Sequence, residues 1–300
     1  MDAADVLETL SITAWHGPFD PELRQRALSA LEHGKVLVLP DLPFQIAPHE
    51  ADLLRPDISG AERKNVSLDP RTGRLGNTAL ESQQTGRLTA MLQRFATDSA
   101  RLLTDLLPAY APAMEQARTS FRPNEIAGRS YSPRHDDKRL HVDAFPSRPL
   151  GGNRILRLFT NVAPDGALRD WRVGEPFERY AQRFLPQIGR PWPGSGWLLE
   201  LLGITKGRRT AYDHFMLGLH DRGKLDAAYQ ATAPYADVHF APGTTWLCFT
   251  DQVLHAALAG HCALEQTFHV PVTAMAEPHH APFQVLERLS SKRDLAKPSA

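Results

Sequence analysis

Two histidines and one aspartate in this 300-residue chain have the types and spacing of a metal-binding set. His141 and Asp143 are separated by one residue, and His255 follows in a distant segment. Two imidazoles and one carboxylate form the facial triad that binds iron(II) in non-haem oxygenases and leaves positions open for reactants. A strand would place His141 and Asp143 on the same face, because side chains alternate along it. The three residues therefore predict an iron(II) site.

The chain contains a second His-x-Asp motif for comparison. His135 and Asp137 lie in a segment with a proline and a run of charged residues, which is typical of a solvated loop. His141 and Asp143 alternate instead with apolar residues, which is typical of a half-buried strand. We therefore assign the ligand pair to His141 and Asp143. A surface ion pair is the simpler explanation of the motif when it is considered alone.

The third ligand has to be chosen among several histidines. His255 follows a Pro-Gly turn and an apolar strand, an order that can return the chain to the first ligand pair. His214 and His220 are separated by a gap that fits no tight chelate on a helix or strand, so we interpret both as structural or solvated. We prefer His255. The alternatives are His261, in a predicted turn, and His269, in a predicted strand.

Composition excludes several classes of protein. The chain has 34 basic and 34 acidic residues and a formal net charge of zero, so no global charge favours nucleic acid. Its two cysteines, Cys248 and Cys262, form no disulfide framework and indicate a reducing compartment. No apolar stretch is long enough to span a bilayer, and the acidic N-terminal segment does not resemble a signal peptide. We expect a cytoplasmic protein.

The elements that must position the ligands can be predicted from periodicity and turn residues. Residues 20–33 and 80–118 show helical patterns, the first with an Asp cap and a following Pro. Apolar, β-branched runs predict the strands, and a helical pattern returns between about residues 170 and 233. The predicted strands are 35–40, 155–162, 238–241, 244–249 and 266–272, and the later helices are 176–184, 197–202 and 224–231.

Short strands interrupted by one helical segment fit an α+β protein. We predict a double-stranded β-helix, or jelly roll, with N-terminal helices and a helical insertion at about residues 170–233. Residues 1–289 would form a single domain. The polar tail, residues 290–300, has a composition typical of disorder.

Beyond the triad, long runs of the sequence resemble a known family. The chain resembles the iron(II)- and 2-oxoglutarate-dependent oxygenases and, more closely, the bacterial Kdo 3-hydroxylases. The resemblance covers most of residues 20–285. It is carried by residues 139–149, 151–157, 171–177, 212–221 and 249–255.

The resemblance implies a reaction and its partners. The family hydroxylates carbon 3 of a 3-deoxy-D-manno-oct-2-ulosonic acid (Kdo) unit in the lipopolysaccharide inner core, giving Ko, succinate and CO2. The implied cofactor and co-substrate are Fe(II) and 2-oxoglutarate, with ascorbate as reductant, and the implied partner is Kdo-bearing lipid A. A lipid-linked substrate would bring the protein to the inner face of the cytoplasmic membrane as a peripheral protein. The sequence does not determine the oligomeric state, the Kdo unit that is recognised or the need for acyl chains.

The resemblance also directs attention to residues that could bind 2-oxoglutarate. The family position that usually carries a basic partner for its distal carboxylate, eleven residues after the last histidine, is Gln266 here. Arg157, on the strand after His-x-Asp, could serve instead, because a planar guanidinium suits bidentate carboxylate binding. A structural salt bridge is the alternative for Arg157. Tyr131 could add a hydroxyl group, or could equally be a buried structural tyrosine.

The charge distribution fits an anionic substrate. Between Arg118 and Arg157 there are nine basic residues and four acidic ones, in a chain with no net charge. Such a patch would attract carboxylates and phosphates, although most of these residues can individually be solvated surface charges.

Two other functions stay open at this point. The chain could be a different 2-oxoglutarate oxygenase that acts on another anionic or lipid-linked molecule, or a non-catalytic sugar-binding jelly roll with His141, Asp143 and His255 as polar core residues. If the three residues bind iron, activity should fall in mild acid, because histidine must be neutral to bind a metal.

Overall fold

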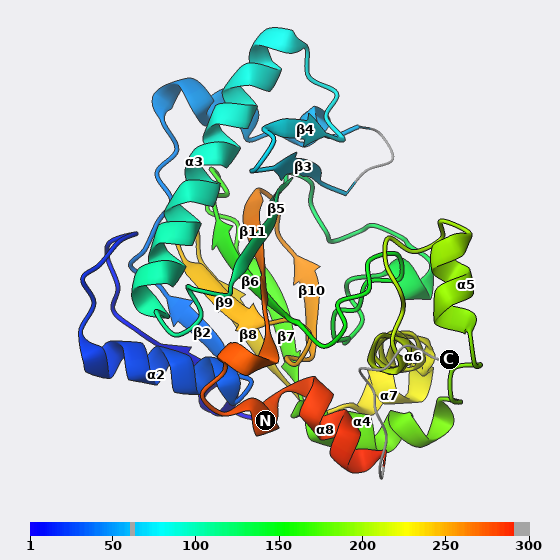
Figure 1. The fold of residues 1–300 in the computed structure, drawn as a ribbon. Coiled ribbons are helices and arrows are strands. Elements are labelled where there is room, and N and C mark those ends of the chain that lie inside the picture. The colour runs from blue at the N-terminus through cyan, green and yellow to red at the C-terminus, as the bar shows by residue number, and fades with distance from the viewer. Residues whose placement is uncertain (61–63, 291–300) are drawn as a thin grey trace.

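The structure, a computed structural model, describes residues 1–60 and 64–290, and its strands form two sheets (Figure 1). In this described chain the larger sheet has eight strands in the order β1-β2-β9-β6-β11-β5-β3-β4, and the smaller has three in the order β10-β7-β8. Neighbouring strands are antiparallel except β1 and β2. The strands are β1 (Leu7–Thr9), β2 (Val36–Leu39), β3 (Val66–Asp69), β4 (Arg74–Gly76), β5 (Glu115–Arg122), β6 (Arg154–Asn161), β7 (Arg169–Gly174), β8 (Tyr235–Phe240), β9 (Thr245–Phe249), β10 (His255–Ala259) and β11 (Ala263–Val270).

An aromatic core lies between the two sheets. The Trp246 ring, from β9 of the larger sheet, stacks on the Phe240 ring of β8 with centroids 4.0 Å apart. The Trp171 ring of β7 meets the edge of Trp246 at 5.6 Å. Because aromatic side chains bury large apolar areas, these contacts hold the smaller sheet against the larger one.

The opposite face of the larger sheet packs against helices. Alternation along β6 turns Leu156 and Leu158 toward this side and Arg157 toward the other. The long helix α3 (Ser82–Leu106) covers it with an apolar stripe that includes Phe95, and α2 (Pro21–Glu32) lies beside α3 (Figure 1). The sheet therefore has an apolar face under the helices and a partly polar face that can hold a site.

A second group of helices lies on the right-hand side of Figure 1 and packs on the loop that carries the proposed ligands. Leu140 and Val142, on either side of His141, are buried in the core that these helices form. The packing fixes the backbone at His141. The remaining helices are α1 (Ala3–Val6), α4 (Phe177–Phe184), α5 (Ser195–Leu201), α6 (Ala211–Leu225), α7 (Ala227–Thr232) and α8 (Pro282–Leu289); the 3-10 turns are η1 (Pro48–Leu53), η2 (Pro56–Ile58), η3 (Pro133–His135), η4 (Leu185–Gln187), η5 (Val272–Ala274) and η6 (Pro278–His280).

Many of the predicted elements are confirmed. Helix α2 begins at Pro21, and the Asp20 carboxylate accepts a hydrogen bond from the Glu22 amide at 2.8 Å, as the cap residues indicate. Strands β2, β6, β8, β9 and β11 lie where apolar runs predict them. In the region 80–118 there is one helix, α3, and the end of that region belongs to β5, whose polar residues hid the strand pattern.

Two predictions about the ligand-bearing elements are wrong in detail. His141 is not part of a regular strand and forms only an isolated bridge with His255. The region 170–233 does not begin with a helix, because residues 169–174 form β7, in which only Trp171 and Val173 supply the apolar alternation. Of the predicted tail 290–300, all residues after Ser290 lie outside the described residues. Within the described residues, no helix is long and apolar enough to cross a membrane.

Candidate metal centre

The three predicted ligands lie together between the two sheets. The backbones of His141 and His255 exchange two hydrogen bonds, of 3.1 and 2.9 Å, so the first residue of β10 is paired with the ligand loop. The Asp143 amide donates to the Thr250 carbonyl at 2.8 Å, which fixes the second half of the loop. Backbone pairing of segments far apart in sequence therefore brings the ligand residues together.

Hydrogen bonds to the backbone orient both imidazoles. The Nδ1 atom of His141 lies 2.7 Å from the Arg139 carbonyl, and that of His255 lies 2.9 Å from the Val253 carbonyl. A carbonyl can only accept, so each Nδ1 carries the proton and each Nε2 is left with its lone pair. Partners of this kind commonly fix the tautomer of a metal-binding histidine.

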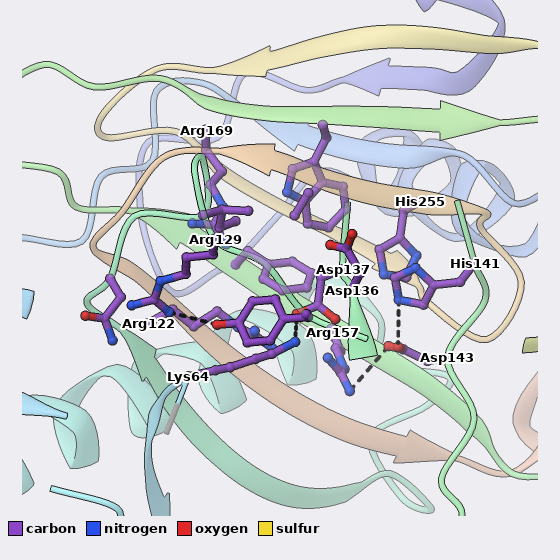
Figure 2. A pocket seen from close by; sticks show the side chains of 16 residues that line it. Lys64, Arg122, Arg129, Asp136, Asp137, His141, Asp143, Arg157, Arg169 and His255 are labelled. Carbon is purple, nitrogen blue, oxygen red and sulfur yellow. Dashed lines mark hydrogen bonds and ion pairs between the residues drawn. The ribbon is translucent and has the colours of Figure 1, made fainter. Parts of the chain in front are cut away.

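The distances fit a single metal ion. One ligand atom from each of His141, Asp143 and His255 can be chosen so that all three lie within 4.8 Å of one another. The His141 Nε2 atom is 3.7 Å from one Asp143 oxygen, and the other Asp143 oxygen is buried with the Arg157 guanidinium 3.3 Å away (Figure 2). A buried carboxylate needs positive charge beside it, which Arg157 supplies in part and a metal cation would complete.

A second group, His33, Glu277 and His280, also meets this distance condition among the described residues. His33 is exposed, and the group does not line the cavity described below.

Burial and local charge keep the three ligands in the protonation states that a metal requires. Burial lowers the pKa of His141 and of His255 below the ordinary imidazole value, and for His141 the nearby His255 and Lys224 add to the effect. Burial alone would raise the pKa of Asp143, but the charges of Arg157 and the histidines lower it below the ordinary value. The site at neutral pH therefore offers two neutral imidazoles and a carboxylate.

A cavity of about 100 Å³ opens beside the triad, and half of the residues that line it carry charged side chains (Figure 2). Its cations outnumber its anions, so the cavity suits an anionic ligand. The cations are Lys64, Arg122, Arg129, Arg157 and Arg169, and the anions are Asp136, Asp137 and Asp143.

Several buried donors in this cavity have no partner in the described chain. They are the Nε atoms of Arg157 and Arg169 and the indole Nε1 of Trp171. The Trp171 ring also stacks on the His255 ring with centroids 5.2 Å apart. Unpaired buried donors are rare, and a ligand rich in oxygen acceptors would satisfy them.

Of the three residues predicted to bind 2-oxoglutarate, Arg157 and Tyr131 line the cavity and Gln266 does not. Arg157 faces the cavity, with its guanidinium 3.3 Å from Asp143 and 3.2 Å from Glu265. Tyr131 also lines the cavity, and its hydroxyl accepts a hydrogen bond from Arg129 at 3.1 Å.

Gln266 does not face the cavity. It is fully buried, and its side chain bonds to Thr119 at 2.6 Å and to backbone carbonyls. Side chains alternate along β11, so the preceding residue, Glu265, is the one that points to the arginines, with Arg122 at 2.7 Å and Arg157 at 3.2 Å.

Sequence reasoning missed Arg122, Arg169 and Trp171 as cavity residues. Arg122 was counted only as one member of a basic patch, and β7, which carries the other two, was not predicted. Arg169 is buried, and burial with the nearby charge of Arg122 lowers its pKa to about 10. The local signal for these two residues is that Arg169 precedes Trp171 by two positions. This spacing places both side chains on one face only if the segment is a strand, and that became known only with β7.

The second His-x-Asp motif does not form a ligand pair. His135 is exposed and its ring bonds to Ser132 at 2.8 Å. Asp137, however, is not simply solvated: it lines the cavity and pairs with Lys64 at 3.0 Å. The loop prediction was therefore correct for the histidine and incomplete for the aspartate.

The alternative histidines lie outside the triad. His214 is partly exposed, and its ring bonds to the Gly189 carbonyl at 2.8 Å. His220 is closer, with its ring edge-on to His141 at 5.5 Å, but it bonds to Asp221 at 2.9 Å. His261 lies just before β11, and His269 lies near the end of that strand.

A larger cavity of about 610 Å³ adjoins the first and shares Arg122 and Arg157 with it. The loop after the ligands forms part of its wall through residues 145–148, and β11 contributes Glu265. Arg74, Arg118 and Arg148 add positive charge.

Two comparisons, with family models and with solved structures, point to one family. Residues 14–293 match a family model described as 3-deoxy-D-manno-oct-2-ulosonic acid (Kdo) hydroxylase. Comparison with curated proteins gives no match.

Solved structures are similar over almost the whole chain. A crystal structure of the Kdo hydroxylase KdoO, a non-haem Fe(II) alphaketoglutarate-dependent dioxygenase in complex with alphaketoglutarate and Fe(III), shares 44% identity and a TM-score of 0.93. The match covers 98% of this chain and 99% of that chain. A cobalt(II) complex of KdoO shares 46% identity with a TM-score of 0.93, and the apo structure 44% with 0.94, over the same shares of each chain.

Proposed function

The chain belongs to the Kdo hydroxylase family, and from that membership we propose that it hydroxylates carbon 3 of a Kdo unit in the lipopolysaccharide inner core. It is a non-haem Fe(II)- and 2-oxoglutarate-dependent dioxygenase, and the products are Ko, succinate and CO2. The observation that carries the proposal is the convergence of His141, Asp143 and His255 beside a cationic cavity.

His141, Asp143 and His255 would hold the iron through two Nε2 atoms and a carboxylate. Bound Fe(II), with 2-oxoglutarate and O2, supplies the oxidant for the C–H bond. The protein keeps the imidazoles neutral through burial and holds their rings through the Arg139 and Val253 carbonyls.

Arg157 would bind a carboxylate of 2-oxoglutarate, with Arg122 and Arg169 nearby. The unpaired Nε atoms of Arg157 and Arg169 support this assignment, because a carboxylate is a bidentate acceptor. Tyr131 would contribute a hydroxyl group. Gln266 would contribute only to the packing of the sheet, since its side chain bonds to Thr119 on the face that points away from the cavity.

The larger cavity would receive the sugar acid. It is basic and shares Arg122 and Arg157 with the metal cavity, so an anionic substrate held there would reach the iron.

We expect Arg148→Ala, at the exposed rim, to raise the KM for the glycolipid and leave the KM for 2-oxoglutarate unchanged.

The architecture supports this function. We interpret the two facing sheets as a double-stranded β-helix in one domain, residues 1–289, because the ligand residues lie between them. The protein would work in the cytoplasm at the membrane surface, where a lipid-linked substrate is presented.

The test combines co-substrate turnover with product analysis. Protein is incubated with Fe(II), ascorbate as reductant, O2 and 2-oxoglutarate, with and without Kdo-bearing lipid A. We expect succinate formation and gain of one oxygen atom by the glycolipid in mass spectrometry, located at carbon 3 by NMR and lost in His141→Ala. Succinate without oxygen gain would indicate a different oxygenase substrate, and neither signal from iron-loaded protein would indicate a sugar-binding module.

A further inference from the structure

The segment around α5 exposes an unusual concentration of apolar side chains. Nine large hydrophobic residues are exposed in the described chain, and six of them lie within residues 192–204. Exposed apolar patches of this kind mark interaction surfaces on soluble proteins. We call these six the apolar patch: Trp192 (83% exposed), Trp197 (53%), Leu198 (49%), Leu201 (64%), Leu202 (63%) and Ile204 (54%).

The patch is built on a segment with a defined conformation. Gly196 lies against the backbone of Arg209, where an added Cβ would be 2.2 Å from the carbonyl oxygen, so only glycine permits this approach. The Thr205 amide closes the end of α5 by donating to the Leu199 carbonyl at 3.2 Å. In Figure 1, α5 lies at the outer edge of the second helix group. The helix is thus held from one side and presents its apolar side chains on the other.

Basic residues border the patch. From Arg190 to Arg209 the sequence contains four basic residues and one acidic residue, Glu200. Arg190 and Lys206 are exposed. Indole rings favour the interface between hydrocarbon and water, and basic side chains are attracted to anionic lipid headgroups. The combination fits an anionic bilayer surface.

The segment is connected to the mouth of the larger cavity. The Lys206 amide donates to the Ser147 carbonyl at 2.9 Å, and the Arg209 guanidinium donates to the Pro146 carbonyl. Pro146 and Ser147 both line the cavity that shares Arg157 with the metal centre. A surface docked through α5 would therefore lie next to the opening through which a substrate enters.

We propose that residues 190–209 dock the protein on an anionic lipid bilayer, with the apolar patch in the interface and the larger cavity facing the membrane. The role of the cavity rests on the proposed function, whereas the docking surface rests on exposure and charge. The arrangement would let a sugar stay attached to its membrane lipid while it reaches the iron.

Vesicle binding tests the docking surface directly. We expect the wild-type protein to co-sediment with vesicles of phosphatidylglycerol and phosphatidylethanolamine, more strongly than with phosphatidylcholine alone. The triple variant Trp192→Ser, Trp197→Ser, Leu201→Ser should lose at least about tenfold in vesicle affinity, because three interfacial anchors are removed. The matched control is Leu168→Ser, an exposed leucine outside the segment (46% exposed), which should bind as the wild type does.

Other outcomes would overturn the proposal. Equal binding by the triple variant and the wild type, or no binding of the wild type to either vesicle, contradicts it. If the wild type dimerises in solution and the triple variant is monomeric without any vesicle binding, the patch is an interface between copies of this chain. Circular dichroism should show that both variants fold, because every substituted side chain is exposed.

A second readout separates docking from catalysis. The triple variant should hydroxylate a deacylated, water-soluble Kdo oligosaccharide at the wild-type rate and turn over vesicle-embedded Kdo-lipid A at least about tenfold more slowly. Equal slowing on both substrates would contradict a docking role. If the wild type hydroxylates neither substrate, the proposed function fails, while vesicle binding still decides the docking surface.

Discussion

Replacement of His141 by alanine is expected to abolish iron binding and lower turnover by at least about a hundredfold, since one of three ligands is lost. The matched control is His135→Ala, which removes the histidine of the other His-x-Asp motif. His135 is exposed and its ring bonds only to Ser132 in the described chain, so this variant should retain iron and activity. Comparable losses in both variants, measured by iron content and succinate formation, would contradict the ligand assignment.

The affinity for metal should persist to a lower pH than the ordinary pKa of histidine, on which the sequence-based expectation of a loss in mild acid rests, would allow. Protons compete with a metal only below the pKa of the ligand, and burial lowers the pKa of both His141 and His255. We expect the Kd for Co(II) to stay within about threefold between about pH 7.5 and pH 6.5, and to rise at lower pH. Calorimetric titration measures this dependence. A Kd that already rises steeply above pH 6.5 would mean that the histidines titrate as exposed groups do.

Arg157→Ala should raise the apparent KM for 2-oxoglutarate by at least about tenfold, because a charge-assisted bidentate contact is lost. Arg172→Ala is the control, since Arg172 pairs with Asp237 on the surface of the smaller sheet and does not line the cavity. Initial rates of succinate formation give both values. An unchanged KM in Arg157→Ala would leave Arg157 with a structural role in its ion pair with Glu265.

At the scale of elements, the turn between β9 and β10 positions two of the candidate ligands. Its Thr250 carbonyl accepts from the Asp143 amide, and its Val253 carbonyl orients the His255 ring. The turn is fixed by Asp251, whose buried carboxylate bonds to the guanidinium of Arg154 at 2.7 Å and to the Ile155 amide at 3.1 Å. The strand β6 and the ligand turn therefore share one buried ion pair.

Asp251→Ala should destabilise the protein by about 3–5 kcal/mol, because Arg154 is left buried without its anionic partner. Iron affinity should fall as well, since the ligand turn loses its anchor. Urea unfolding and iron titration measure the two effects. Asp237→Ala, which breaks an exposed pair with Arg172, should cost less than about 1 kcal/mol. Equal costs in the two variants would show that the buried pair does not secure the turn.

At the scale of the whole molecule, the site lies between sheets that are held by the aromatic core, so ligand binding is coupled to global stability. Anything that binds only the folded state stabilises it, by about 2.7 kcal/mol at a hundred times its Kd. Co(II) with 2-oxoglutarate should therefore raise the unfolding temperature, and chelation should reverse the rise. Differential scanning calorimetry measures the shift. A similar shift in His141→Ala would indicate that the metal stabilises the protein from another place.

The sequence by itself predicted the three residues that the structure brings together as a candidate ligand set, and it determined much of the secondary structure. His141 and Asp143 could be chosen because their types, spacing and apolar neighbours are all local properties. The strand at residues 155–162 and the helix at 20–33 were likewise predictable, since apolar alternation and cap residues act over a few positions.

Only the tertiary structure decided which charges lie around the candidate metal site. On β11 the residue that lines the larger cavity and pairs with Arg122 and Arg157 is Glu265 and not Gln266, because alternation from a register set by β5 and β6 turns one residue in and the next out. Arg122 and Arg169 reach the cavity beside the triad from strands in different sheets. These positions depend on long-range strand pairing, which no local pattern around each arginine encodes.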